Sequence, residues 1–399
     1  MLTTAEPDIE SLLADHSFVQ NPYPVYHRLL REAPVWTTPT GEKVFFRFDD
    51  VYSILRDQDR FGQAIRQHKH PAFVGLDPPD HTRLRGLVSR AFTPRAIRRL
   101  QDDIVRASEE LMARLRPQGQ MELVDAYARP VPTRMITDML GIPLVDADRW
   151  EVWANTIHRA TSAIQYLPDQ RAAAEELRLA AVAASEMEAE YFAEVIARRK
   201  AEPPRDDILG ALMQAEEAGD RLSDVELRYT LVLLLGAGHS TSVSLLANGT
   251  HALLTNPDQL VLLREDRSLI PAAIEEMIRW DGIVQVGRRR VRRDTTVSGV
   301  PLREGDLVMI VLGAANRDPA MFEDPDRFDI TRANVNRHVG FGFGIHHCLG
   351  ANLARAEIGV ALDALLDLPG LQLADREPPD YGSAYGLRGI ERLALGWNA

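Results

Sequence analysis

The sequence predicts a mainly α-helical fold with small β-sheets, an α+β arrangement, on two observations. First, apolar residues recur at intervals of three and four, opposite charged faces, in seven segments. These segments are residues 22–33, 49–57, 80–90, 94–116, 130–141, 146–166 and 170–200. Second, runs of strand-forming residues are few and short. They are residues 35–38 with 43–48, 291–297 and 307–312.

Length and composition indicate one large globular unit. The chain has 399 residues, of which 45% are hydrophobic and 26% charged, so disordered and fibrous classes are excluded. No repeat, low-complexity tract or linker divides it. We therefore expect a single domain over residues 1–399, with residues 1–14 as a flexible tail. The net charge of −12 disfavours nucleic acid and anionic membranes as partners.

The cysteine count and the N-terminal residues indicate the cellular compartment of the protein. The single cysteine, Cys348, cannot form an intramolecular disulfide, which is typical of a reducing cytoplasm. The first residues contain neither a basic region nor an apolar run, so we expect no signal peptide. Residues 229–257 lack charged side chains, but glycines and polar residues interrupt them. We expect a buried helix there rather than a membrane span.

That uncharged segment belongs to a long central helix with clear ends. Ser223 and Glu226 form a capping-box pattern at its start. Asn256 and the proline after it end the helix. At ~1.5 Å per residue its length is roughly 48 Å, enough to cross the molecule. Gly236 and Gly238 each cost roughly 1 kcal/mol of helix stability relative to alanine. We infer that something needs the space at that point.

The sharpest chemical pattern surrounds Cys348. Residues 341–350 read Phe-Gly-Phe-Gly-Ile-His-His-Cys-Leu-Gly, just before a helical pattern over 351–366. The glycines permit tight turns and close approach of a flat ligand. Backbone N–H groups at the helix start favour the thiolate. A structural zinc site is disfavoured because there is no second cysteine. An inert buried cysteine beside a glycine turn is the alternative.

This loop resembles the Phe-Gly-x-Gly-x-His-x-Cys-x-Gly signature of the cytochrome P450 family, the haem–thiolate monooxygenases, and matches every fixed position. Glu276 and Arg279 match the family's Glu-x-x-Arg motif, and residues 322–328 resemble a third segment in the same order. The resemblance implies the cytochrome P450 fold, with haem b between the central helix and the Cys loop. It implies that Cys348 is the axial ligand of the iron. It also implies that Arg327 joins Glu276 and Arg279 in a buried network.

The two haem propionates require cationic or hydrogen-bonding partners. The resemblance implies His346 for one contact, and His81 with Arg85 for another, because they stand one helical turn apart. An ordinary amphipathic helix start is the alternative reading of that pair. The family pattern selects Arg289 as a further partner from a run of arginines. A slip of one residue would select a neighbour instead, Arg288 or Arg290.

The oxygen-activation segment departs from the family pattern. The family's central helix usually reads Ala/Gly-Gly-x-Asp/Glu-Thr-Thr, and residues 237–242 here read Ala-Gly-His-Ser-Thr-Ser. Thr241 matches the alcohol that hydrogen-bonds dioxygen. Ser240 replaces the acid, and a serine can hold a water but cannot itself relay a proton as a carboxylate does. His239 points about 100° away along the helix, so it is not a direct substitute. The alternative is that water alone supplies protons.

The implied substrate pocket is mostly apolar. The resemblance places Leu233, Leu234, Ala237 and residues 283–286 around it, with the C-terminal turn nearby. These residues imply a largely apolar organic substrate. The polar side chains proposed to orient this substrate are Gln285 and Tyr385.

The implied function is monooxygenation, in which one oxygen atom of O2 enters that substrate. Because the chain ends soon after Cys348, we expect no fused reductase, and electrons from a separate ferredoxin or flavodoxin with its reductase. Six arginines between His81 and Leu100, without an acid among them, predict a basic docking patch. They are arginines 83, 85, 90, 95, 98 and 99. The alternatives are a peroxide-driven haem–thiolate enzyme, favoured by Ser240, and a haem-based sensor, disfavoured because no residues remain for an effector domain.

Overall fold

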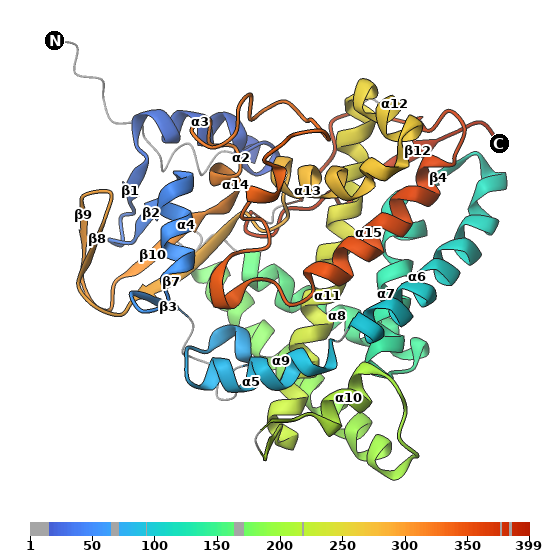
Figure 1. The fold of residues 1–399 in the computed structure, drawn as a ribbon, viewed down its shortest axis with the longest axis horizontal. Helices are drawn as coiled ribbons and strands as arrows, with labels where there is room; N and C mark the ends of the chain where they lie inside the picture. Colours follow the sequence, from blue (N-terminus) through green and yellow to red (C-terminus); the bar gives the residue numbers. More distant parts are fainter. Residues whose placement is uncertain are drawn as a thin grey trace.

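Helices make up most of the chain, as the periodicity predicts (Figure 1). The structure, a computed structural model, describes residues 16–64, 72–92, 94–162, 171–217, 219–375, 377–382 and 385–399, so the predicted tail 1–14 lies outside it. The α-helices are α2 His16–Gln20, α3 Tyr23–Glu32, α4 Phe48–Arg56, α5 Asp80–Ala91, α6 Pro94–Leu115, α7 Pro130–Leu140, α8 Ala147–Ser162, α9 Arg171–Ala201, α10 Ile208–Gln214, α11 Asp224–Thr255, α12 Pro257–Glu265, α13 Ile270–Trp280, α14 Leu312–Ala315 and α15 Ala351–Leu366. A π-helical turn, Val124–Ala128, precedes α7.

The strands form small sheets, of which the largest described one has five strands in the order β1-β2-β10-β7-β3. Within it β10 is parallel to β2, and the other pairs are antiparallel. The strands are β1 Val35–Thr37, β2 Lys43–Phe45, β3 Phe61–Gln63, β4 Gln120–Glu122, β5 Glu216–Glu217, β6 Asp220–Arg221, β7 Val286–Val291, β8 Thr295–Val297, β9 Val300–Leu302, β10 Leu307–Val311, β11 Gln372–Leu373 and β12 Ala394–Gly396.

One strand prediction was wrong. The expected strand 291–297 is instead the end of β7 and the separate strand β8. β7 begins five residues earlier and runs through consecutive arginines, which conceal a strand from a search for apolar residues. The arginines are accommodated because successive side chains of a strand point to opposite faces.

Helix α11 runs through the middle of the molecule, with the five-stranded sheet on one side and helices α6 and α7 on the other (Figure 1). Its predicted ends are confirmed, since Ser223 and Glu226 form the reciprocal capping box and Asn256 follows the last helical residue. Within the described residues α11 is the one helix long and apolar enough to cross a membrane, and 61% of its most apolar window is buried inside the protein. It is therefore a core helix.

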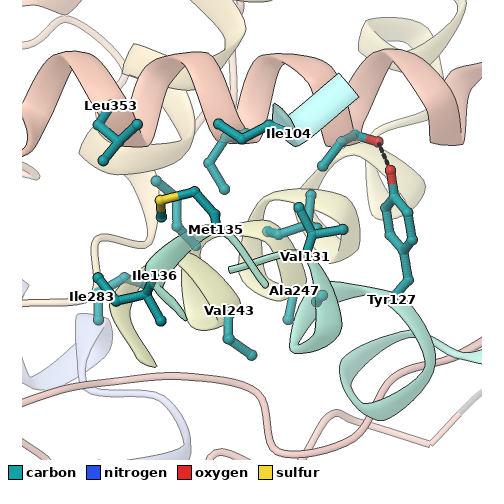
Figure 2. Packing of buried hydrophobic residues seen from close by; sticks show 14 of the residues in the cluster. Ile104, Tyr127, Val131, Met135, Ile136, Val243, Ala247, Ile283 and Leu353 are labelled. Carbon is teal, nitrogen blue, oxygen red and sulfur yellow. Dashed lines mark hydrogen bonds between the residues drawn. The ribbon is translucent and has the colours of Figure 1, made fainter. Parts of the chain in front are cut away.

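The core around α11 joins four helices (Figure 2). Ile104 of α6, Met135 of α7 and Leu353 of α15 are buried together with Val243 of α11. Burial of an apolar side chain of this size contributes roughly 1.5–3 kcal/mol. Tyr127, at the edge of this core, is buried as well, and its hydroxyl is 2.6 Å from the hydroxyl oxygen of Ser108. This packing fixes α11 against α15, the helix that follows the Cys loop.

A buried ion network ties α13 to the loop that follows α14. Arg279 donates from Nε and Nη2 to the two carboxylate oxygens of Glu276, at 2.6 and 2.7 Å, and both side chains are fully buried. Arg332 supplies the second guanidinium, with its Nε 3.4 Å from Oε1 of Glu276. The implied role of Arg327 was wrong, because its side chain is exposed and its backbone carbonyl accepts from both other arginines.

Candidate functional site

The Cys348 loop is a tight turn fixed by its own backbone. The Cys348 N–H donates to the Phe341 carbonyl over 2.9 Å, closing the loop just before α15. Gly342 and Gly344 have φ of 69° and 71°, in the left-handed region that favours glycine. A Cβ at Gly344 would also lie 2.8 Å from the Leu55 carbonyl oxygen. Glycine is thus required at 344 by conformation and by space.

An ion network anchors the loop to α13. Arg355 of α15 lies over the Phe341 ring at 4.7 Å and donates to Glu275 over 2.5 Å. His338 lies 2.8 Å from the same carboxylate. Burial acts to raise the pKa of Glu275, but His338 and Arg355 outweigh it and lower that pKa to about 2. The carboxylate is therefore ionised at neutral pH and holds both ends of the loop.

The pKa of the Cys348 thiol is raised, whereas the position before a helix predicts a lowered pKa. The backbone N–H groups of Gly350 and Ala351 do lower it, as predicted, and so do Arg85 and Arg355. Burial by the surrounding protein is the largest effect, however, and leaves the thiol pKa above its ordinary value, although one side of the residue is exposed. The protein environment alone thus does not produce a thiolate. A bound metal ion does so by coordination.

The structure brings together four residues that the sequence assigned to the propionates. The rings of His81 and His346 lie 4.3 Å apart. Burial is the main cause that lowers the pKa of His346 to about 3, followed by the positive charges of His81, Arg289 and Arg85. Both ring nitrogens of His81 and Nδ1 of His346 are buried without a hydrogen-bond partner among the described residues. We call these four residues the cationic cluster: His81, Arg85, Arg289 and His346.

Among the described residues, one carboxylate, that of Asp77, acts on the cationic cluster. Burial lowers the pKa values of His81 and Arg289, and the negative charge of Asp77 acts to raise both. It is shared, because its Oδ1 also accepts from the Gln63 N–H over 2.9 Å. Sequence reasoning missed this residue, since an aspartate before two prolines is typical of an ordinary turn.

The arginine register in β7 follows from the alternation of the strand. Arg288 points to Glu42, with its Nε 3.0 Å from the carboxylate, and Arg290 donates to the Gly305 carbonyl over 3.0 Å. Arg289, between them, acts electrostatically on His346. The structure therefore places Arg289, rather than either neighbour, in the cationic cluster.

The middle of α11 carries the predicted hydroxyls. Thr241 and Ser240 are partly buried, and the Thr241 hydroxyl donates to the Ala237 carbonyl over 2.7 Å. Ala237 is exposed although α11 is a core helix, and a Cβ on Gly236 would meet no atom within 4 Å. His239 faces away, with Nε2 2.9 Å from the Thr133 hydroxyl oxygen. This agrees with its exclusion as a substitute acid.

The two side chains expected to orient a substrate are used elsewhere. Gln285 is fully buried, and its Oε1 accepts from the Tyr26 hydroxyl over 3.0 Å. The Tyr385 hydroxyl lies 2.9 Å from the same tyrosine oxygen, within the cluster that packs around α3. That assignment was therefore wrong. Tyr26, distant in sequence, satisfies both polar groups. Leu233 and Ala237 remain as incompletely buried positions on one face of α11.

The predicted basic patch is smaller than the sequence suggests. Arg83 pairs with Asp220 and Glu226, and Arg99 pairs with Asp206 over 2.9 Å. Arg85 donates to the His347 carbonyl over 2.5 Å, and its charge acts on His346 of the cationic cluster. Arg90 and Arg98 are exposed. The side chain of Arg95 lies outside the described residues.

Comparison with known proteins gives consistent matches along the chain. Residues 42–381 match the family described as Cytochrome P450. The chain is 39% identical to cytochrome P450 107B1 of Saccharopolyspora erythraea over 99% of each chain. It is 37% identical to a vitamin D(3) 25-hydroxylase of Pseudonocardia autotrophica over 99% of this chain and 98% of the relative. It also resembles the crystal structure of CYP109E1 from Bacillus megaterium in complex with testosterone, with a TM-score of 0.84, 30% identity and coverage of 95% and 100%.

Proposed function

The chain belongs to the cytochrome P450 family, and we propose that this monooxygenase inserts one oxygen atom of O2 into a largely apolar organic substrate, with electrons from a separate ferredoxin or flavodoxin and its reductase. The observation that carries the proposal is the convergence of the cationic cluster beside the single thiol, Cys348.

Haem b is the cofactor of this family, and the residues present fit it. The buried, unpartnered imidazole nitrogens of the cationic cluster suit two propionate carboxylates. The exposed Cys348 suits an axial ligand, and the open space at Gly236 and the exposed Ala237 on α11 suit a flat ring. We assign the propionates to His81, Arg85, Arg289 and His346, and the iron to Cys348. When bound, haem b supplies the iron chemistry that activates dioxygen.

The residues of α11 contribute hydroxyl groups to this chemistry. Thr241 can turn its hydroxyl from the Ala237 carbonyl toward a ligand on the open side of the helix. Ser240 can hold a water but supplies no acidic proton of its own. We propose that Thr241 positions the oxygen ligand and that Ser240 orders water beside it.

The apolar substrate is supported by the side chains and by the relatives. Leu233 and Ala237, one turn apart on α11, are not fully buried, and we propose that they contact the substrate. One relative is named for vitamin D(3), and one similar structure contains testosterone. We propose a substrate of the same broad apolar kind, held mainly by contact area.

Electron delivery is proposed to use the exposed arginines near the start of α6. Arg98 is exposed on a protein of net charge −12, so an acidic electron carrier would be attracted to it. We also propose that the enzyme is cytoplasmic, consists of a single domain and binds neither nucleic acid nor membranes. This proposal rests on the single cysteine and the acidic balance.

A peroxide-driven reaction is the second candidate, and Ser240 favours it because the usual acid is missing. The test supplies one apolar substrate with either a reductase, a ferredoxin and O2, or with hydrogen peroxide alone. We expect product from the first system at the higher rate. Product from peroxide alone, with none from electrons and O2, would overturn the proposal in favour of the second candidate.

A further inference from the structure

Asp77 connects the two elements that carry most of the cationic cluster. Its backbone carbonyl accepts from the His81 N–H over 3.0 Å, at the start of α5. Its side-chain Oδ1 accepts from the Gln63 N–H over 2.9 Å, on the edge strand β3. Gln63 stands opposite Arg289 in the pairing of β3 with β7. Asp77 therefore ties α5, which supplies His81 and Arg85, to the strands around Arg289.

The chain leaves space for this carboxylate. The strand position before Gln63 is Gly62, and a Cβ there would lie 2.5 Å from Oδ2 of Asp77. The Asp77 side chain is only partly buried. Any larger residue at position 62 would push the carboxylate away from the strand, so the glycine and the aspartate fit each other.

Asp77 acts on the cationic cluster by its charge and leaves the donors of the cluster unused. Its one ion pair among the described residues is long, 3.9 Å from Oδ2 to Nη1 of the partly exposed Arg292. The ring nitrogens of His81 have no hydrogen-bond partner in the described part of the chain. The negative charge of Asp77 nevertheless acts to raise the pKa values of His81 and Arg289. Such an effect needs no direct contact, because charges interact over several ångströms in a partly desolvated site.

The charges of the cluster show in which direction Asp77 acts on a bound haem. Burial is the main cause that lowers the pKa of His346 to about 3, and burial also lowers the pKa of His81, so both imidazoles are mostly neutral at neutral pH. Arg85 and Arg289 then supply two positive charges, which two propionates would match. Asp77 adds a further negative charge, and its removal makes the site more positive whether or not Arg292 offsets part of it.

We propose that Asp77 is a positioning residue of the propionate site, which joins α5 to β3 by its hydrogen bonds and limits the affinity for haem by its charge. The inference rests on the assignment of the propionates to the cationic cluster. In the empty site the carboxylate offsets part of the repulsion between Arg85 and Arg289. In the filled site it repels the propionates. Its hydrogen bonds and its charge therefore act on haem binding in opposite directions.

Two substitutions at one position separate these effects. Asp77→Asn removes the charge and keeps an oxygen that accepts from the Gln63 N–H, whereas Asp77→Ala removes both. Asp294→Asn is the matched control. The Asp294 carboxylate also accepts a backbone N–H, that of Glu304 over 2.9 Å, but it contributes to the pKa of no residue of the cationic cluster.

The experiment measures haem transfer to an acceptor protein and the reduction potential of the haem-loaded proteins. Asp77→Asn should lose haem about three- to tenfold more slowly than wild type, because removal of a nearby negative charge favours the propionates. Its reduction potential should be more positive, because the same change favours the reduced iron. Asp77→Ala should retain haem less well than Asp77→Asn, since β3 loses an acceptor, and Asp294→Asn should match wild type in both measurements.

The reduction potential separates an effect of charge from a purely structural one. Haem loss from Asp77→Asn as fast as from wild type or faster, an unchanged reduction potential, or identical behaviour of Asp77→Asn and Asp77→Ala would each overturn the inference. These outcomes leave the monooxygenase function intact. Failure of the wild type to bind haem would instead overturn the proposed function.

Discussion

Two groups of buried charge in this protein are built on opposite principles. Around Glu276, two guanidiniums and a backbone N–H surround one carboxylate, and backbone carbonyls accept from the other guanidinium N–H groups, so the network finds its partners within the chain. In the cationic cluster, Arg85 and Arg289 lie with two imidazoles, and Asp77 is the one carboxylate that acts on them among the described residues. The first group is complete without a ligand. The second is not.

The difference teaches how to separate structural charges from ligand-binding ones. Burial of a charge is costly unless a partner offsets it. A network that supplies its own partners stabilises one arrangement of the chain, as the contacts of Arg279 to α13 and the following loop do. A cluster with surplus donors, such as the unpartnered nitrogens of His81, is stabilised by an anion from outside.

The largest expected effect is a loss of folding stability when the network around Glu276 is broken. Glu276→Ala leaves Arg279 and Arg332 as uncompensated buried charges, which should cost about 3–5 kcal/mol of folding free energy. Urea unfolding measures this loss. Glu175→Ala, which removes an exposed pair with Arg178, serves as the control and should leave the midpoint unchanged. Equal midpoints for all three proteins would contradict the structural role of the network.

The next largest expected effect is a loss of haem affinity when the cationic cluster is altered. Arg289→Ala removes a charge-assisted contact worth roughly 1.5–3 kcal/mol, so haem affinity should fall about 10–100-fold. Arg288→Ala is the matched control, because its side chain points to Glu42 on the other face of β7. Haem transfer to an acceptor protein measures the difference. Similar retention in both variants would remove Arg289 from the proposed propionate site.

A third kind of buried charge is Glu188 of α9, whose carboxylate oxygens have no hydrogen-bond partner among the described residues, and its effect on stability should depend on pH. Burial raises the pKa of Glu188 to about 8 from the ordinary 4.5, so its contribution to stability is fully present below pH 4.5 and is lost as pH rises toward 8. Glu188→Gln avoids that loss. The variant should gain on wild type between these pH values, by on the order of a few kcal/mol at pH 8.

Thermal or urea unfolding across that pH range tests the Glu188 expectation. Glu190→Gln, on the exposed face of the same helix, should follow the wild-type pH dependence. A constant difference between Glu188→Gln and wild type at every pH would show that the carboxyl is not desolvated in the folded protein.

The smallest effect is expected at the surface. Arg98→Ala should slow the first electron transfer from an acidic ferredoxin a few-fold at low salt, and the difference should vanish as ions screen the charge over ~10 Å at 0.1 M. Arg99→Ala should matter less, because Asp206 already pairs with that arginine. Stopped-flow reduction at several ionic strengths measures both. Identical salt dependence in all proteins would leave the docking proposal without support.

Local sequence patterns predicted the parts of the fold that local chemistry controls. The capping box at Ser223 and the Asn256–Pro257 pair define α11 because both act within a few residues. Strand β7 was placed too late because its arginines are held by distant groups, such as Glu42. Pattern recognition found the members of the cationic cluster, but it assigned Arg327 a role that its exposed side chain does not perform.

The contacts of the remaining polar residues depend on tertiary packing, which local sequence patterns do not predict. Nothing near Gln285 or Tyr385 in the sequence indicates that both side chains contact the hydroxyl of a tyrosine in α3. Gln285 and Tyr385 were misassigned for this reason, since their partner Tyr26 is more than 250 residues away in sequence. Burial of polar groups is decided by tertiary contacts between helices.

The absorption spectrum of the reduced protein with carbon monoxide tests the central claim most directly, namely that the single thiol at the incomplete cluster holds haem iron. Wild type should show the red-shifted Soret band of thiolate ligation, and Cys348→His should move that band to the position of a histidine-ligated haem. A wild-type spectrum that already resembles a histidine-ligated haem, or a Cys348→His spectrum identical to wild type, would contradict the assignment of Cys348.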